Sequence, residues 1–240
     1  PDHPFVRFNL GMTHADAGEY AEAIEHLRHC IAVSQAEESH LRKAYALLVS
    51  SCAHSERTEE ALDVCQTGLK LYPDDKELLF RQALVLHELG RLEESAQTYE
   101  RVLSEKESRH FTSIDTGISG FKARQNLAVV YEALGRLHDA EEQWRRVLEE
   151  RPDYQPALRG LGSVLIRQQQ LDKADQLVES IRSGKQQESE ADLLAALVLE
   201  AGGRTDSAIQ ALIEGDARYP QEIEFLRECC RMLFEYQGPV

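Results

Sequence analysis

Apolar residues recur every three or four positions along most of the chain, which is the spacing of amphipathic α-helices. Within this pattern, a small residue after an acidic or polar pair returns at intervals of 38, 34, 45, 34 and 34 residues. These small residues are Ala23, Ala61, Ser95, Ala140, Ala174 and Ala208. The chain therefore repeats a unit of 34 residues, and two of its intervals are longer.

Glycine and proline divide each unit into two helices. A glycine stands five residues before four of the six small residues: Gly18, Gly90, Gly135 and Gly203. It lies where a first helix must end, at a position that favours left-handed backbone. A proline stands twelve residues after three of them, at Pro73, Pro152 and Pro220, where it cannot continue the second helix. The small residue lets the two helices approach closely.

This pattern predicts six helical pairs and a final single helix. We expect helices over residues 4–17 and 20–34, 38–54 and 57–71, 75–88 and 91–105, 120–133 and 136–150, 154–168 and 171–183, 187–201 and 204–217, and 221–236. One pair cannot bury its apolar face alone, so neighbouring pairs must stack. The last helix either caps that stack or leads into further chain.

The sequence resembles the tetratricopeptide repeat (TPR) family over nearly its whole length. Its nearest matches to the family pattern are LGMTHADAGEYAEAIEHLRHCI (10–31) and LAVVYEALGRLHDAEEQWRRVL (127–148). The resemblance implies an all-α superhelix, or TPR solenoid, as a single domain over 1–240. Its repeats would cover 4–37, 38–74, 75–105, 120–153, 154–186 and 187–220, with an insertion at 106–119 and a final helix at 221–236.

Composition narrows the possible partners and compartment. The 240 residues include 42 acidic and 27 basic side chains, a formal net charge of −15. This balance argues against general nucleic-acid binding and docking on anionic membranes. No apolar run is long enough to span a bilayer, and no signal peptide opens the chain, which predicts a cytoplasmic protein.

The missing initiator Met suggests a piece of a longer protein. Its five cysteines lie in apolar helical patterns, so we expect reduced core residues.

The insertion KESRHFTSIDTGIS (106–119) interrupts the period and has the composition of a loop. Three interpretations remain open: an ordered loop packed on the neighbouring repeat, a lip over the groove, or a phosphate or metal site. For the last of these, Asp115, Thr116, Gly117 and Gly120 could form an anion nest before the next helix.

The region from this loop onward resembles a segment of bacterial TPR regions that follow a family-two glycosyltransferase domain. The similarity covers residues 110–148 and includes the step Gly120-Phe121-Lys122-Ala123 followed by Asn126-Leu127. It implies that this chain belongs to a larger glycosyltransferase. No Asp-x-Asp metal motif of such a catalytic domain is evident in the chain.

In the TPR family the first helix of each pair lines a concave groove. The repeat register predicts a partner-binding set at Phe8, Asn9, Met12, Lys43, Phe80, Arg81, His87, Lys122, Gln125, Asn126, Arg159 and Arg167. Arg81, Lys122 and Arg159 could pair with a carboxylate or phosphate of a partner. The competing interpretation is that the basic residues pair with Glu77, Glu88 or Glu132 and that the phenylalanines are core.

No catalytic, metal or cofactor site is predicted. His26 and Cys30 share a helix face, but Cys30 occupies a packing position of the repeat. His87 lacks a nearby nucleophile, and His110 stands in a loop. The first hypothesis is a non-catalytic module that binds a peptide or partner domain, within a bacterial glycosyltransferase. The second is an accessory part of the transferase site that acts through loop 106–119. The third is an assembly scaffold unrelated to sugar transfer, and the oligomeric state stays open.

Overall fold

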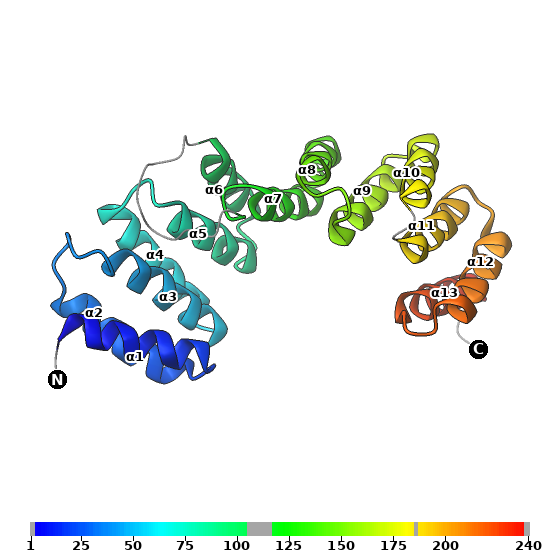
Figure 1. Cartoon of the computed structure of the whole chain (residues 1–240). Helices are drawn as coiled ribbons and strands as arrows, with labels where there is room; N and C mark the ends of the chain where they lie inside the picture. Colours follow the sequence, from blue (N-terminus) through cyan, green and yellow to red (C-terminus); the bar gives the residue numbers. More distant parts are fainter. Residues whose placement is uncertain (1–2, 105–116, 185–186, 238–240) are drawn as a thin grey trace. The chain divides into compact units, whose positions relative to one another are not determined.

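The computed structural model describes residues 3–104, 117–184 and 187–237. Thirteen α-helices and no strand occur in these ranges (Figure 1). The helices are α1 (Pro4–Asp16), α2 (Tyr20–Val33), α3 (Leu41–His54), α4 (Thr58–Leu71), α5 (Lys76–Glu88), α6 (Leu92–Ser104), α7 (Phe121–Ala133), α8 (Leu137–Glu150), α9 (Gln155–Arg167), α10 (Leu171–Ser183), α11 (Glu188–Ala201), α12 (Thr205–Arg218) and α13 (Ile223–Gln237). The predicted all-α class of helix-turn-helix repeats is confirmed.

The observed helices agree with the predicted ones to within about two residues, with one clear exception. Helix α3 begins at Leu41, three residues later than predicted, after a turn at 36–40. Residues 106–116 of the predicted insertion lie outside the described residues, so the three interpretations of that loop remain untested.

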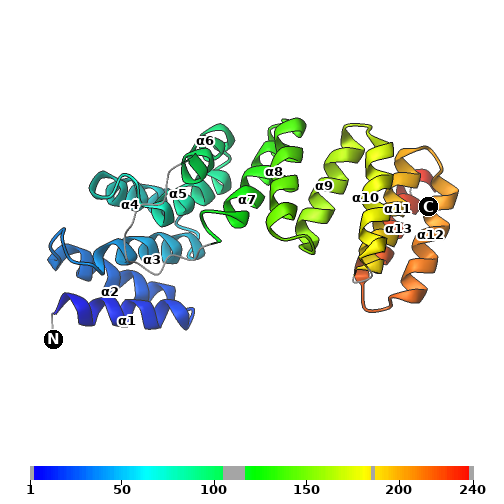
Figure 2. The ribbon, with the colours of Figure 1, turned by 45° about the horizontal axis from the view of Figure 1, so that its top comes forward.

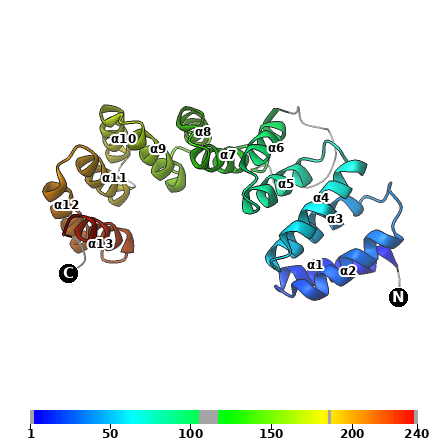
Figure 3. The ribbon, with the colours of Figure 1, turned by 180° about the vertical axis from the view of Figure 1, so that it is seen from behind.

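The chain divides into two compact units, residues 1–134 and 135–240. In the first unit, helices α1 to α6 pair in chain order, and α6 packs on α7 (Figures 2 and 3). The first helices also touch one another in succession, α1 with α3, α3 with α5 and α5 with α7. They therefore form one layer of the unit. That all repeats form a single domain stays a prediction.

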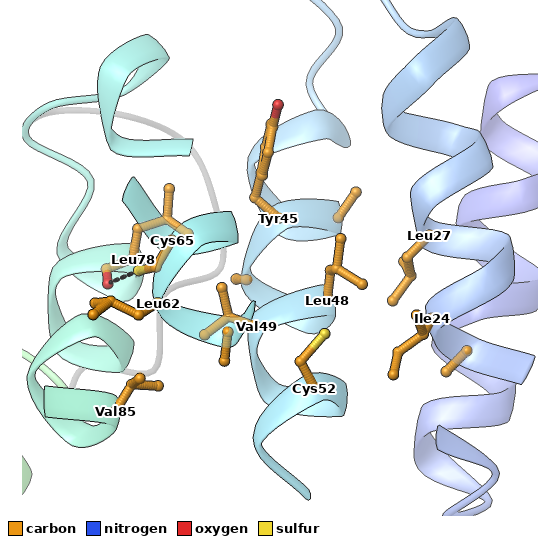
Figure 4. Close-up of a cluster of buried hydrophobic side chains, with 14 of the residues drawn as sticks. Ile24, Leu27, Tyr45, Leu48, Val49, Cys52, Leu62, Cys65, Leu78 and Val85 are labelled. Atoms are coloured by element: carbon orange, nitrogen blue, oxygen red, sulfur yellow. Dashed lines mark hydrogen bonds between the residues drawn. The ribbon is translucent and has the colours of Figure 1, made fainter. Parts of the chain in front are cut away.

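The core of the first unit runs continuously from pair to pair. Ile24 and Leu27 of α2, Leu48 and Val49 of α3, and Val85 of α5 belong to one cluster of buried side chains (Figure 4). Cys30, Cys52 and Cys65, predicted to be packing residues, belong to this cluster. The Cys65 thiol also donates a hydrogen bond to the Leu78 carbonyl at 3.2 Å. All six small residues of the repeat are fully buried. Their burial is consistent with the close packing that the repeat requires.

A left-handed residue ends the first helix of every pair. The four predicted glycines have φ between +72° and +78°. Glu56 and Gln169 occupy the same repeat position in the second and fifth pairs, and both have φ of +59°. The following amide bonds back to the helix, as in Arg57 N to the Cys52 carbonyl at 2.9 Å. The turn geometry thus persists where the glycine is missing.

In the second unit each helix from α8 to α12 packs on the next helix, and the first helices α9 and α11 are in contact. Its core includes Leu193, Leu212, Phe225 and Met232. Gly215 of α12 lies against the Phe225 ring, and an added Cβ there would come within 2.3 Å of it. A glycine is therefore required for α13 to pack this closely on α12.

The outer side of α13 is apolar and exposed. It carries Ile223, Leu226, Phe234 and Tyr236, and Phe234 is 67% exposed. Cys230 also lies on the exposed side, so the expectation that all five cysteines are core residues is wrong for this one. Its neighbour Cys229 faces the core, because successive helical residues point about 100° apart. No described helix is both long and apolar enough to cross a membrane.

Candidate partner-binding surfaces

In the first unit, the predicted residues Lys43 and Arg81 form one charged cluster with Glu77. Lys43 of α3 donates to Glu77 of α5 at 2.7 Å, and Arg81 donates to the same carboxylate oxygen at 2.8 Å. Burial raises the pKa of Glu77, but the hydrogen bonds from Lys43 and Arg81 outweigh it, and the pKa lies below its ordinary value. The competing interpretation is therefore correct for Arg81, which pairs with Glu77.

The aromatic members of the predicted set lie mostly inside the unit. Phe8 is buried and contacts the rings of Phe5 and His40, with centroids 6.3 and 5.5 Å apart. Phe80 is half-buried and meets the Tyr99 ring edge-on at 5.7 Å. Burial raises the pKa of Tyr99. These side chains mainly pack the first helices against their neighbours and leave little surface for a partner.

The other predicted residues of this unit lie on its first helices and are half-buried: Asn9, Met12, His87, Lys122, Gln125 and Asn126. Lys43 alone of the predicted set in α1 to α7 is exposed. Whether these residues meet a partner stays a prediction.

The second unit contains a pocket of about 190 Å³ on its first helices. Its apolar wall consists of Leu158 of α9, Ile181 of α10, and Leu193, Leu194 and Leu197 of α11. Its polar rim consists of Arg159 and Ser163 of α9, Glu190 of α11, and Glu224, Arg227 and Glu228 of α13. An apolar pocket with a few polar groups is the usual form of a binding site.

Ion pairs join α9, α11 and α13 around this pocket. Arg159 donates through Nε to both oxygens of Glu190, at 2.9 and 2.7 Å, and through Nη1 to Glu224 at 3.5 Å. Arg231 of α13 donates to Glu200 of α11 at 2.7 Å and to Glu228 at 2.7 Å. Hydrogen bonding to Glu190 raises the pKa of Arg159, which stays charged. Ion pairs thus hold Arg159, Glu190 and Glu228 of the rim in place.

Of the predicted set, the pocket includes Arg159, while Arg167 lies exposed at the end of α9. The register did not predict Glu190, Glu224 or Arg227. A signal was present: Arg159–Glu190 and Glu200–Arg231 are both 31 residues apart. This separation is one repeat less one helical turn, so it brings residues of successive first helices together.

The described residues contain no group of three or more His, Cys, Asp or Glu side chains that could hold a metal ion. His26, singled out in the sequence, stacks on His14 with ring centroids 5.3 Å apart and contacts Arg7. Cys30 beside it is buried in the core.

Three family models, each described as tetratricopeptide repeat, match residues 9–37, 53–109 and 131–198. The chain is a tetratricopeptide repeat protein. The family match accounts for the helix pairs, the glycine turns and the buried small residues described above. A search of curated proteins finds no significant match.

Solved structures of other TPR proteins share this fold at low sequence identity. PilF of Pseudomonas aeruginosa is 16% identical, with a TM-score of 0.66, over 95% of this chain and 97% of that one. A TPR protein from Parabacteroides merdae is 16% identical, with a TM-score of 0.69, over 88% and 78%. YrrB, described as having an unusual peptide-binding site, is 15% identical, with a TM-score of 0.58, over 77% and 90%. These similarities establish the fold alone.

Proposed function

We propose that this TPR chain is a non-catalytic protein–protein interaction module that binds a peptide or a partner domain on its first helices. The pocket rimmed by Arg159, Glu190 and Glu224 carries the proposal. It combines apolar wall residues with charges already fixed by ion pairs, so a ligand would meet a largely preformed site. TPR proteins are generally scaffolds, and YrrB of the same fold is described as binding peptides.

The proposed context is a larger bacterial glycosyltransferase in the cytoplasm, in which this region would position an acceptor protein. The resemblance of residues 110–148 to such regions supports it. The alternatives are direct participation of loop 106–119 in the transferase site, and an assembly scaffold unrelated to sugar transfer.

Site-directed photocrosslinking tests the interaction proposal. A benzophenone amino acid replaces Ser163, which is exposed at the pocket, and in a control variant it replaces Asp175, which is exposed on α10. We expect one partner, identified by mass spectrometry, to crosslink at position 163 and to be displaced by excess unmodified chain. Equal labelling at both positions, or none, would contradict the proposal.

Shortening loop 106–119 in the full-length protein separates the transferase alternatives. Loss of transfer to a protein acceptor, with transfer to a short free acceptor retained, supports a recognition role. Loss of both supports the loop's participation in the transferase site. A full-length gene without any glycosyltransferase domain would leave the scaffold alternative.

A further inference from the structure

The pocket of the second unit has the size and charge pattern of an anchor site for one particular kind of side-chain pair. We propose that it binds a peptide in which a phenylalanine-sized apolar side chain stands next to an acidic residue. This inference rests on the proposed function and specifies its ligand. The apolar side chain would enter against Leu158, Leu193 and Leu197, and the acidic one would meet Arg227.

The dimensions of the pocket favour a single large apolar side chain. Its volume is about 190 Å³, and a cavity of roughly 150 Å³ lined by aliphatic side chains is enough to hold benzene. Leu158, Ile181, Leu193 and Leu194 are all buried and form the apolar surface of the pocket. An aromatic ring placed there would remove this apolar surface from water, which is the main source of binding energy at such anchors.

The carboxylates of the rim already have cationic partners. Glu190 is only 3% exposed, and Arg159 holds both its oxygens. Glu228 accepts a hydrogen bond from Arg231 at 2.7 Å. A basic residue that paired with Glu190 or Glu228 would have to displace one of these arginines and leave a guanidinium without its partner, whereas Glu224 has a longer contact, 3.5 Å, with Arg159. At Glu190 and Glu228 the rim therefore discriminates against a cation.

Arg227 is placed differently from Arg159, the other arginine of the rim. Its side chain is 66% exposed, and its guanidinium lies 3.6 Å from the Glu228 carboxylate, a distance longer than a hydrogen bond. A guanidinium has five N–H donors, which suit a carboxylate in a paired geometry. A ligand carboxylate could bind there without breaking the Arg159–Glu190 pair. Most of the net charge of −15 is screened at physiological salt, since screening acts over about 8 Å, so the main repulsion on a ligand carboxylate comes from Glu224 and Glu228 of the rim.

Four capped hexapeptides test the proposal: Gly-Gly-Phe-Asp-Gly-Gly, and its versions with Asn or Lys in place of Asp or with Ala in place of Phe. Binding is followed by NMR of leucine methyl groups in the whole chain, with Leu193, Leu194 and Leu197 as reporters. We expect the Phe-Asp peptide to shift these methyls and to bind about threefold or more tightly than the Phe-Asn peptide. The Ala-Asp and Phe-Lys peptides should bind more weakly still.

Two variants and a control complete the test. Arg227→Gln should abolish the preference for Asp over Asn, while Arg204→Gln, at an exposed turn position of the same unit, should keep it. Ser163→Phe should fill the pocket and prevent binding, and circular dichroism would verify that both pocket variants stay folded. Equal binding of the Phe-Asp and Ala-Asp peptides, a preference for Lys, or an Asp preference that survives Arg227→Gln would overturn the inference. Crosslinking of a partner at position 163 alongside such a result would leave the proposed function standing.

Discussion

Arg159 of α9 donates hydrogen bonds through its Nε to both carboxylate oxygens of Glu190 on α11, at 2.9 and 2.7 Å. Glu190 is almost fully buried, whereas the Arg159 side chain is 42% exposed. The pair is a link between two successive first helices and also a wall of the pocket. Its energetic role is therefore mainly to compensate a buried charge.

Removal of Arg159 should destabilise the second unit. Arg159→Met leaves the Glu190 carboxylate buried without its partner, and we expect a loss of about 1–3 kcal/mol, reduced from a fully buried pair because Arg159 is partly exposed. Glu190→Gln in the same chain should recover part of the loss by removing the charge. Urea unfolding followed by fluorescence of Trp144, the one tryptophan of the chain and buried on α8, measures both. Equal stability of the single and double variants would contradict this account.

Replacing the two non-glycine left-handed residues should stabilise the protein. Glu56 and Gln169 both have φ of +59°, and their side chains are exposed. We expect Glu56→Gly and Gln169→Gly each to raise the free energy of unfolding by about 0.5–1 kcal/mol, the relief of left-handed strain less the added entropy of the unfolded chain. Gly18→Ala, at φ of +78° with open space around it, should do the opposite. Thermal unfolding of the three variants tests the sign at each turn.

Acid should destabilise the first unit through Glu77. Its pKa in the folded chain lies below the ordinary value because hydrogen bonds from Lys43 and Arg81 outweigh the effect of burial. The unfolded chain then binds more protons, so this contribution is present above the unfolded pKa and is lost as pH falls through the folded pKa. Urea unfolding by circular dichroism should show a smaller loss of stability below about pH 4 in Glu77→Gln than in the original chain. Glu93→Gln, at an exposed position on α6, is the control and should leave the pH profile unchanged.

Thiol labelling should distinguish the exposed Cys230 from the four buried cysteines. Burial raises the pKa of Cys30, Cys52 and Cys229, and it raises that of Cys65 to about 12. Cys230 is exposed. Because the thiolate is the reactive form, we expect one thiol per chain to react with Ellman's reagent in the folded protein and five after denaturation. Cys230→Ser should abolish the fast reaction; a fast reaction that persists in this variant would place another thiol at the surface.

The agreement between sequence and structure was closest where local chemistry repeats. The 34-residue interval, the glycines and the buried small residues predicted the helix pairs because each acts within one pair. The glycine pattern did not indicate that Glu56 and Gln169 adopt the same backbone, since neither residue type favours a left-handed conformation. Their geometry follows from the helices on either side, which must turn through the same angle in every repeat.

The sequence by itself therefore determined the fold class and, to within about three residues, the helix boundaries, because helical periodicity and turn residues are local properties. Only the tertiary structure decided which charges are already paired and where a pocket opens. Arg81 and Arg159 have similar repeat positions, yet Arg81 bonds to Glu77 of its own helix and Arg159 to Glu190 of the next first helix. Partner choice between side chains depends on the distance and angle between packed helices, and those depend on every residue in the interface.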